Sequence, residues 1–164
     1  MTFLDMMRWI HILTMVVVLG GYIFLSLFWW PIVRRATDDV RLQVRLVSQT
    51  LRRFFTVVIL GLTVQIMTGG LYLLPPAYRA FGSGMEFALA SFHKVLIFKL
   101  VAVLIVMLLV PMQLFGMAFR LTRMDVGIYA FDPDLFARIG QRMQVVSYII
   151  IALLTCIVIL STYL

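Results

Sequence analysis

Four long apolar stretches alternate with short polar segments along the chain. They cover residues 9–30, 54–74, 92–119 and 143–164. Each reaches the length of about 20 apolar residues that a helix needs to cross the hydrocarbon core of a bilayer. The sequence shows no strand-like alternation, and open strands could not pair their backbone groups in lipid. The pattern therefore predicts an all-α integral membrane protein, a bundle of four transmembrane helices forming one domain over residues 1–164.

Prolines lie at the ends of two of these stretches. Pro31 follows the first stretch, and the pair Pro75 and Pro76 follows the second. Because proline lacks a backbone N–H and its ring clashes with the preceding turn, we expect a helix to end at each position.

Aspartates mark two predicted helix starts. Asp38 or Asp39 is placed to cap an extension of the second helix that begins near Val40. Asp132 followed by Pro133 is typical of an N-cap and the first residue of a long fourth helix. We therefore expect both helices to begin before their apolar stretches.

The composition supports the membrane assignment. The chain is 63% apolar and 13% charged, with a mean hydropathy of +1.07, whereas soluble domains average about 45–50% apolar and about 25% charged residues. Intrinsic disorder is excluded because disordered chains are poor in apolar residues. The net charge of +7 lies mainly between the apolar stretches. We attribute it to orientation in the bilayer and expect no nucleic-acid partner.

The distribution of basic residues predicts the orientation. The segment between the second and third stretches holds only Arg79, with Lys94 at its far edge. Ten arginines lie in the other two connecting segments: Arg34, Arg35, Arg41, Arg45, Arg52, Arg53, Arg120, Arg123, Arg138 and Arg142. Basic residues favour the cytoplasmic side. We therefore expect a multi-pass protein of the inner (plasma) membrane with both termini on the periplasmic or extracellular side (N-out/C-out).

Few polar side chains occur inside the predicted helices. An ionisable group within a bilayer is costly and is by default a functional candidate; here these are His11, His93 and Lys99. Both histidines lie near the start of odd-numbered helices, which run in the same direction, and their predicted depths differ by only about 6 Å. Gln65 and Gln113 are expected to form hydrogen bonds between helices.

Two imidazoles on facing helices are the arrangement that axial ligation of a b-type haem requires. We therefore predict haem b between His11 and His93, with Gly69 and Gly70 flanking the porphyrin. Lys99 would face the bundle and pair with a haem propionate or a substrate carboxylate, or would extend its amine to the interface. The alternative for each histidine is a structural residue at the interface, and for the glycines it is close helix packing.

Copper is a second metal that fits the residues near His11. Met15 lies one helical turn from His11, and a thioether with an imidazole is a soft ligand set that suits Cu(I). The eleven methionines of the chain are equally suited to filling gaps between apolar side chains. Copper handling therefore stands as an alternative to haem binding.

Several short motifs resemble the CopD-like (copper resistance D) membrane domain and the related HemJ-like protoporphyrinogen oxidases. The matching segments are Ile10-His11-Ile12-Leu13, Gly20-Gly21, Thr68-Gly69-Gly70-Leu71-Tyr72 and Phe98-Lys99-Leu100. The resemblance implies four transmembrane helices, haem b, a histidine early in the first helix and a lysine in the third. HemJ-like chains carry a second histidine two residues before that lysine, where this chain has Ile97, and His93 would replace it as a ligand.

These features predict a haem b protein that passes electrons, alone or as a small subunit of a respiratory complex. Its partners would be the lipid bilayer and either quinol or a periplasmic electron carrier. If the chain is an enzyme, it is an oxidoreductase of the protoporphyrinogen oxidase kind. The sequence is also compatible with Cu(I) transport and with the role of a cofactor-free accessory subunit.

Overall fold

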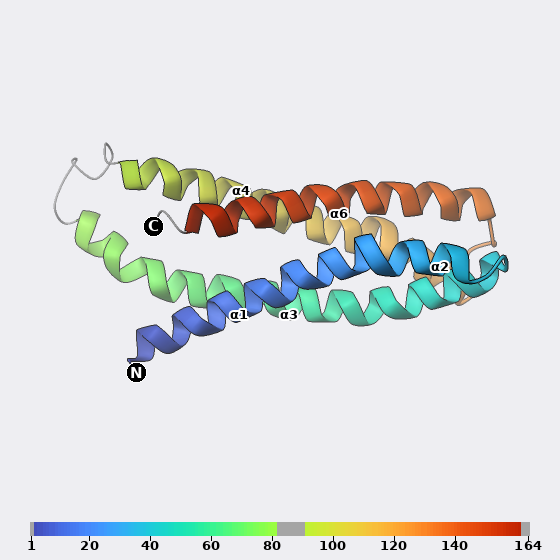
Figure 1. The fold of residues 1–164 in the computed structure, drawn as a ribbon, viewed down its shortest axis with the longest axis horizontal. Helices are drawn as coiled ribbons and strands as arrows, with labels where there is room; N and C mark the ends of the chain where they lie inside the picture. The colour runs from blue at the N-terminus through green and yellow to red at the C-terminus, as the bar shows by residue number, and fades with distance from the viewer. Residues whose placement is uncertain (1, 82–90, 162–164) are drawn as a thin grey trace.

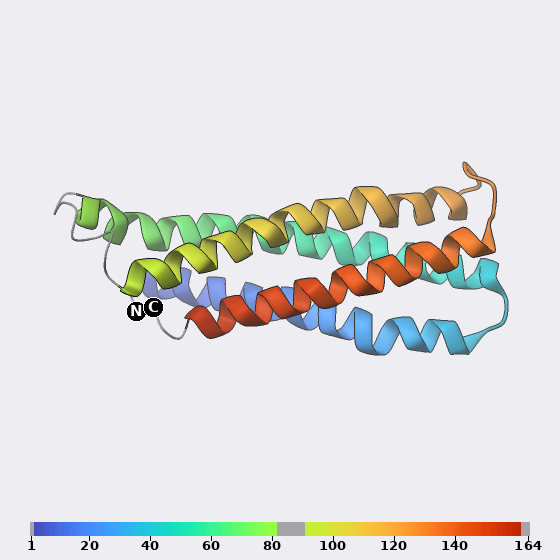
Figure 2. The same ribbon diagram turned by 90° about the horizontal axis from the view of Figure 1, so that it is seen from above.

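The computed structural model describes the backbone of residues 2–81 and 91–161, and the side chains of residues 2–71 and 95–161. Within this part of the chain, four long rods run side by side (Figures 1 and 2). The first rod consists of α1 (Phe3–Ile23), η1 (Phe24–Trp29) and α2 (Trp30–Ala36), and the second is α3 (Val40–Phe81). The third consists of α4 (Ser91–Gln113), η3 (Leu114–Ala118) and α5 (Phe119–Asp125), and the fourth is α6 (Pro133–Ser161).

Each rod contains a helix long and apolar enough to cross a membrane, which confirms the predicted fold class. These candidate spans are Phe3–Ala36, Val40–Leu71, Val95–Asp125 and Pro133–Ser161. Both chain termini lie at one end of the bundle, which we call the terminal end (Figure 1). The turns that follow α2 and α5 lie at the other end, which we call the arginine-rich end because ten of the fourteen Lys and Arg residues lie toward it.

The helices extend past the apolar stretches at the arginine-rich end, and the predicted aspartate caps explain two of the extensions. Asp39 Oδ1 accepts hydrogen bonds from the backbone N–H groups of Arg41 and Leu42. Asp132 Oδ1 accepts in the same way from Asp134 and Leu135, in the first turn of α6. Of the two candidate caps in the first connection, Asp39 is therefore the one that binds the helix start.

The expectation that prolines end the first two helices is wrong. The first rod continues through Pro31 to Ala36, and the backbone of α3 continues through Pro75 and Pro76 to Phe81. In the first rod, the π-helical segment η1 lies directly before α2, and the N–H of Trp30 bonds to the carbonyl five residues earlier, that of Leu25. A π-bulge is one of the usual ways in which a helix absorbs a local break in its hydrogen bonding, so the rod is not interrupted.

A second π-helical segment lies in the third rod. Pro111 is inside α4, and η3 begins three residues later at Leu114. The N–H of Phe119 bonds to the carbonyl of Leu114, again five residues back. Two of the four rods therefore carry a proline close to a π-helical segment.

The rods pack as two pairs, α1 on α3 and α4 on α6, with further contacts of α3 on α5 and of α1 on α6. The two pairs lie closer together toward the arginine-rich end than at the terminal end (Figure 1). In the first rod burial follows the same gradient, since no described side chain before Val18 is fully buried, whereas Tyr22 is completely enclosed. The packed core therefore lies in the middle and toward the arginine-rich end.

Trp30 is the largest side chain in that core. Its ring is 5% exposed and lies against Phe136 on α6, with the two ring centroids 6.1 Å apart. A Cβ atom added at Gly140 would overlap the Trp30 ring. Gly140 is therefore the residue that lets α6 approach the first rod at this level.

Candidate functional site

The imidazole of His11 is held against α3 at the terminal end. Its Nδ1 atom is 2.9 Å from the hydroxyl oxygen of Thr68. The Thr68 hydroxyl donates its only proton to the backbone carbonyl of Val64, at 2.7 Å. With the Thr68 proton on Val64, the hydroxyl accepts from His11, and in this tautomer Nδ1 carries the proton and Nε2 keeps a lone pair.

A second hydrogen bond fixes the backbone next to this ring. The side-chain amide of Gln65 donates to the carbonyl oxygen of His11 at 2.5 Å. Gln65 and Thr68 lie three residues apart on α3, on one face of the helix. Together they hold both the backbone and the ring of His11 to α3, which confirms that Gln65 bonds between helices.

The two glycines next to Thr68 differ in what surrounds them. A Cβ atom added at Gly69 would lie 3.2 Å from Cε1 of His11, so the absent side chain leaves the space in which the imidazole lies. A Cβ atom added at Gly70 would meet nothing within 4 Å. Gly69 is therefore part of the seat of the histidine ring itself, and Gly70 is not.

Lys99 approaches the same site from the other helix pair. It is half-buried on α4, and it lies close enough to His11 for the two side chains to interact electrostatically. Ile97 and Phe98, which precede it, are well exposed. His11 on α1 and Lys99 on α4 therefore belong to different helix pairs and interact through their charges.

The other predicted metal ligands are His93 and Met15. His93 lies in the first turn of α4, and its side chain is outside the described residues. Met15 is half-buried and packs against the apolar core. Among the side chains that the structure describes, no group of three or more His, Cys, Asp or Glu residues could hold a metal ion.

A separate polar cluster lies deep in the bundle, around Gln113. The hydroxyl of Tyr22 donates to Oε1 of Gln113 at 3.2 Å. The Gln113 amide nitrogen donates to the carbonyl of Met143 at 3.0 Å and to the hydroxyl of Ser147 at 2.7 Å. Gln113 is completely buried and joins three rods. Its predicted role in bonding between helices is confirmed, and it lies at the last residue before η3.

Sequence reasoning did not single out Thr68, which proves to be the partner of the His11 ring. The signal was present, because Thr68 directly precedes Gly69 in the Thr68-Gly69-Gly70 run, but a threonine in an apolar helix most often bonds to its own backbone. Comparisons with models of protein families, with curated proteins and with solved structures find no match to the chain. The geometry of the site and the chemistry of its residues therefore carry the functional argument.

Proposed function

We propose that this chain binds haem b at the terminal end of the bundle, with Nε2 of His11 as an axial ligand, and that it passes electrons. The observation that carries the proposal is the hydrogen bond from His11 Nδ1 to Thr68. Metal-ligating histidines almost always donate their other ring N–H to a neighbouring acceptor, which fixes the tautomer and the orientation of the ring. His11 has this arrangement, and Nε2 has no hydrogen-bond partner among the described residues.

The surroundings of His11 fit a porphyrin in several respects. The ring is seated on Gly69 of α3, so a small residue lies beside the imidazole, as the close approach of a flat ligand requires. His93, on the facing helix α4, is the second axial ligand in this proposal. Lys99 supplies a cation beside the site, and a haem propionate is the anion that would pair with it.

Each of these residues has a defined task. When bound, the haem supplies reversible one-electron chemistry. In this proposal Thr68 accepts the Nδ1 proton of His11, and Gln65 fixes the backbone that carries the ring. Leu13 on α1 and Phe98 on α4 are exposed apolar side chains suited to contact with lipid. The chain thus orients the cofactor.

The location follows from the same proposal. The arginine-rich end would face the cytoplasm, so the haem would lie near the periplasmic or extracellular face of the inner membrane. Quinol in the bilayer or a periplasmic carrier would then exchange electrons with it, with the chain alone or as a small subunit of a respiratory complex. Labelling a cysteine placed at Thr2, in a Cys156→Ala background, with an impermeant reagent on intact cells tests this orientation; protection from the reagent would overturn it.

An oxidoreductase of the HemJ-like kind is the second candidate. It rests on the approach of Lys99 to His11, since the cation could hold a carboxylate of protoporphyrinogen as well as one of haem. Copper handling has less support, because the half-buried Met15 packs against the apolar core. Addition of protoporphyrinogen to the haem-loaded protein separates oxidation of this substrate from electron transfer alone.

The absorption spectrum of the purified full-length protein tests haem binding. We expect a b-type α-band after reduction with dithionite, and loss of this band in His11→Ala and in His93→Ala. Gly69→Ala should also weaken the band, because the added methyl group pushes on the His11 ring. Gly20→Ala is the matched control, since its added methyl group meets nothing within 4 Å. A colourless protein, or a normal band in His11→Ala, would contradict the proposal.

A further inference from the structure

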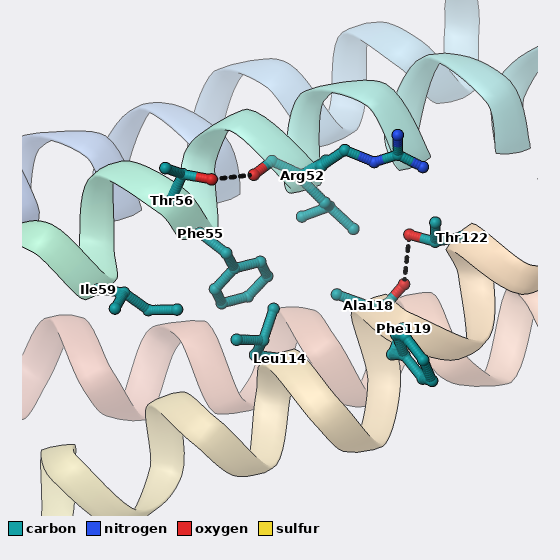
Figure 3. A pocket seen from close by; sticks show the side chains of 9 residues that line it. Arg52, Phe55, Thr56, Ile59, Leu114, Ala118, Phe119 and Thr122 are labelled. Carbon is teal, nitrogen blue, oxygen red and sulfur yellow. Dashed lines mark hydrogen bonds between the residues drawn. The ribbon is translucent and has the colours of Figure 1, made fainter.

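A groove of about 350 Å³ lies between α3 and the third rod, on the side of the arginine-rich end. Leu51, Phe55 and Ile59 line it from α3, and Leu114, Ala118 and Phe119 line it from η3 and α5. Figure 3 shows these side chains bordering a space between the two helices. The volume lies at the lower end of the range for small-molecule sites.

The walls of this groove are apolar in effect, although two threonines line it. The hydroxyl of Thr56 donates to the carbonyl of Arg52 at 2.9 Å, and the hydroxyl of Thr122 donates to the carbonyl of Ala118 at 3.0 Å. Both bonds lie within one helix (Figure 3). Neither threonine therefore has a hydroxyl proton free to donate into the groove. Its surface is suited to a hydrocarbon chain.

One end of the groove is charged. Arg52 lines it, and its guanidinium points toward the N-terminal part of α3, which is the arginine-rich end (Figure 3). No acidic side chain pairs with Arg52 in the part of the chain that the structure describes. Ten basic residues against five acidic ones lie toward this end, so the surroundings are cationic as well.

We propose that an acidic phospholipid binds here, with one acyl chain in the groove and its phosphate on Arg52. The arrangement matches the amphiphile, because the apolar walls extend into the bilayer and the guanidinium lies toward the headgroup level. A planar guanidinium binds phosphate oxygens through two parallel hydrogen bonds, and an acidic headgroup adds net attraction to the cationic end. A lipid with no net charge gains only the hydrogen bonds between its phosphate and Arg52, without the added attraction to the cationic end.

This site is independent of the haem site. Arg52 and Thr68 are 16 residues apart on α3, which corresponds to about 24 Å along the helix. None of the groove residues forms a hydrogen bond with the His11 ring, whose partner is Thr68. The lipid site can therefore be tested whether or not the chain binds haem.

The test uses native mass spectrometry of the full-length protein titrated with phosphatidylglycerol or phosphatidylcholine of identical acyl chains. We expect phosphatidylglycerol to bind more tightly by about fivefold, the effect of one basic residue near an anionic surface. Arg52→Gln should weaken the binding of both lipids, because both carry the phosphate, and should reduce this preference because one of the basic residues is lost. Arg53→Gln is the matched control, because Arg53 has the same charge and lies next in sequence but does not line the groove, so it should retain most of the preference.

A second variant tests the groove itself. Ile59→Trp places a larger side chain at the apolar end of the groove, far from Arg52, and should weaken the binding of both lipids at that site. Circular dichroism and elution from a sizing column check that each variant is folded. Equal losses in Arg52→Gln and Arg53→Gln would mean diffuse attraction and would overturn the proposal. Unchanged lipid binding in a folded Ile59→Trp variant would also overturn the proposal.

Discussion

The two ends of the bundle use the same kind of residue in different ways. Gln113, in the packed part, is completely buried and bonds to partners on two other rods. Gln65, at the terminal end, is half-buried and makes one bond, to the backbone of His11. The first glutamine joins three helices in a closed core, whereas the second joins a single helix pair where the bundle opens.

The difference indicates that the two ends contribute differently to holding the helices together. A chain in lipid gains little from burying apolar side chains against each other, because lipid tails are equally apolar. Close approach at Gly140 and the polar cluster at Gln113 therefore provide much of the specific association of the rods. At the terminal end, Gly69 and the two hydrogen bonds to His11 join α1 to α3 only, and the charges of the half-buried His11 and Lys99 interact between the pairs. The polar bonds from Gln113 therefore join both helix pairs, whereas those at His11 stay within one pair.

Replacing the two glutamines gives the largest expected contrast. Gln113→Leu keeps the volume but leaves the hydroxyls of Tyr22 and Ser147 without their amide partner in the core, and we expect a loss of about 3 kcal/mol in the free energy of unfolding. Gln65→Leu leaves only the His11 carbonyl, which retains its bond within the helix, and should cost about 1 kcal/mol or less. Unfolding by denaturing detergent measures both. Equal losses would contradict the difference between the two ends.

Gly140→Ala tests the close approach of α6 to the first rod. Because the added methyl group overlaps the buried ring of Trp30, we expect a loss of about 2 kcal/mol, typical of overpacking. Gly116→Ala, also within a rod, is the control; its added methyl group meets nothing within 4 Å, and alanine is the better helix former. Thermal unfolding in detergent compares the two. A Gly140→Ala variant as stable as Gly116→Ala would place the packing contact elsewhere.

The hydrophobic pattern is sufficient to predict four helices, but not their continuity. Length and apolar content alone identify the spans, and aspartate side chains identify the starts of α3 and α6. The missing N–H of Pro31, Pro75 and Pro76 predicts helix ends that the structure does not have. The first rod instead passes Pro31 with the π-helical segment η1 before it, and such segments are too rare to be expected from a sequence pattern.

The candidate site is predictable in part, since the cost of ionisable groups in lipid points to His11 and Lys99. The structure adds what the cost argument could not provide: the partner Thr68, the seat formed by Gly69 and the proximity of Lys99. All three depend on the rotation of each helix about its axis. That rotation is set by contacts between helices. A residue's position in the sequence predicts its depth in the membrane but not the direction in which its side chain points.

A small effect on stability, and the effect most specific to the site, is expected for Thr68→Val. Valine has nearly the shape of threonine but no hydroxyl, so the variant loses the bond to His11 Nδ1 and about 1 kcal/mol of stability. In the wild-type protein, nitrogen-15 NMR of the haem-free chain should show the proton on Nδ1, because the Thr68 hydroxyl is committed to Val64. In Thr68→Val, nothing holds it there, and the tautomer with the proton on Nε2 should increase. That tautomer has no lone pair on Nε2 for a metal, so haem affinity should fall while the fold remains intact. A wild-type His11 protonated on Nε2 would mean that Thr68 does not prepare a ligand, and the case for His11 as an axial ligand would fail at its first step.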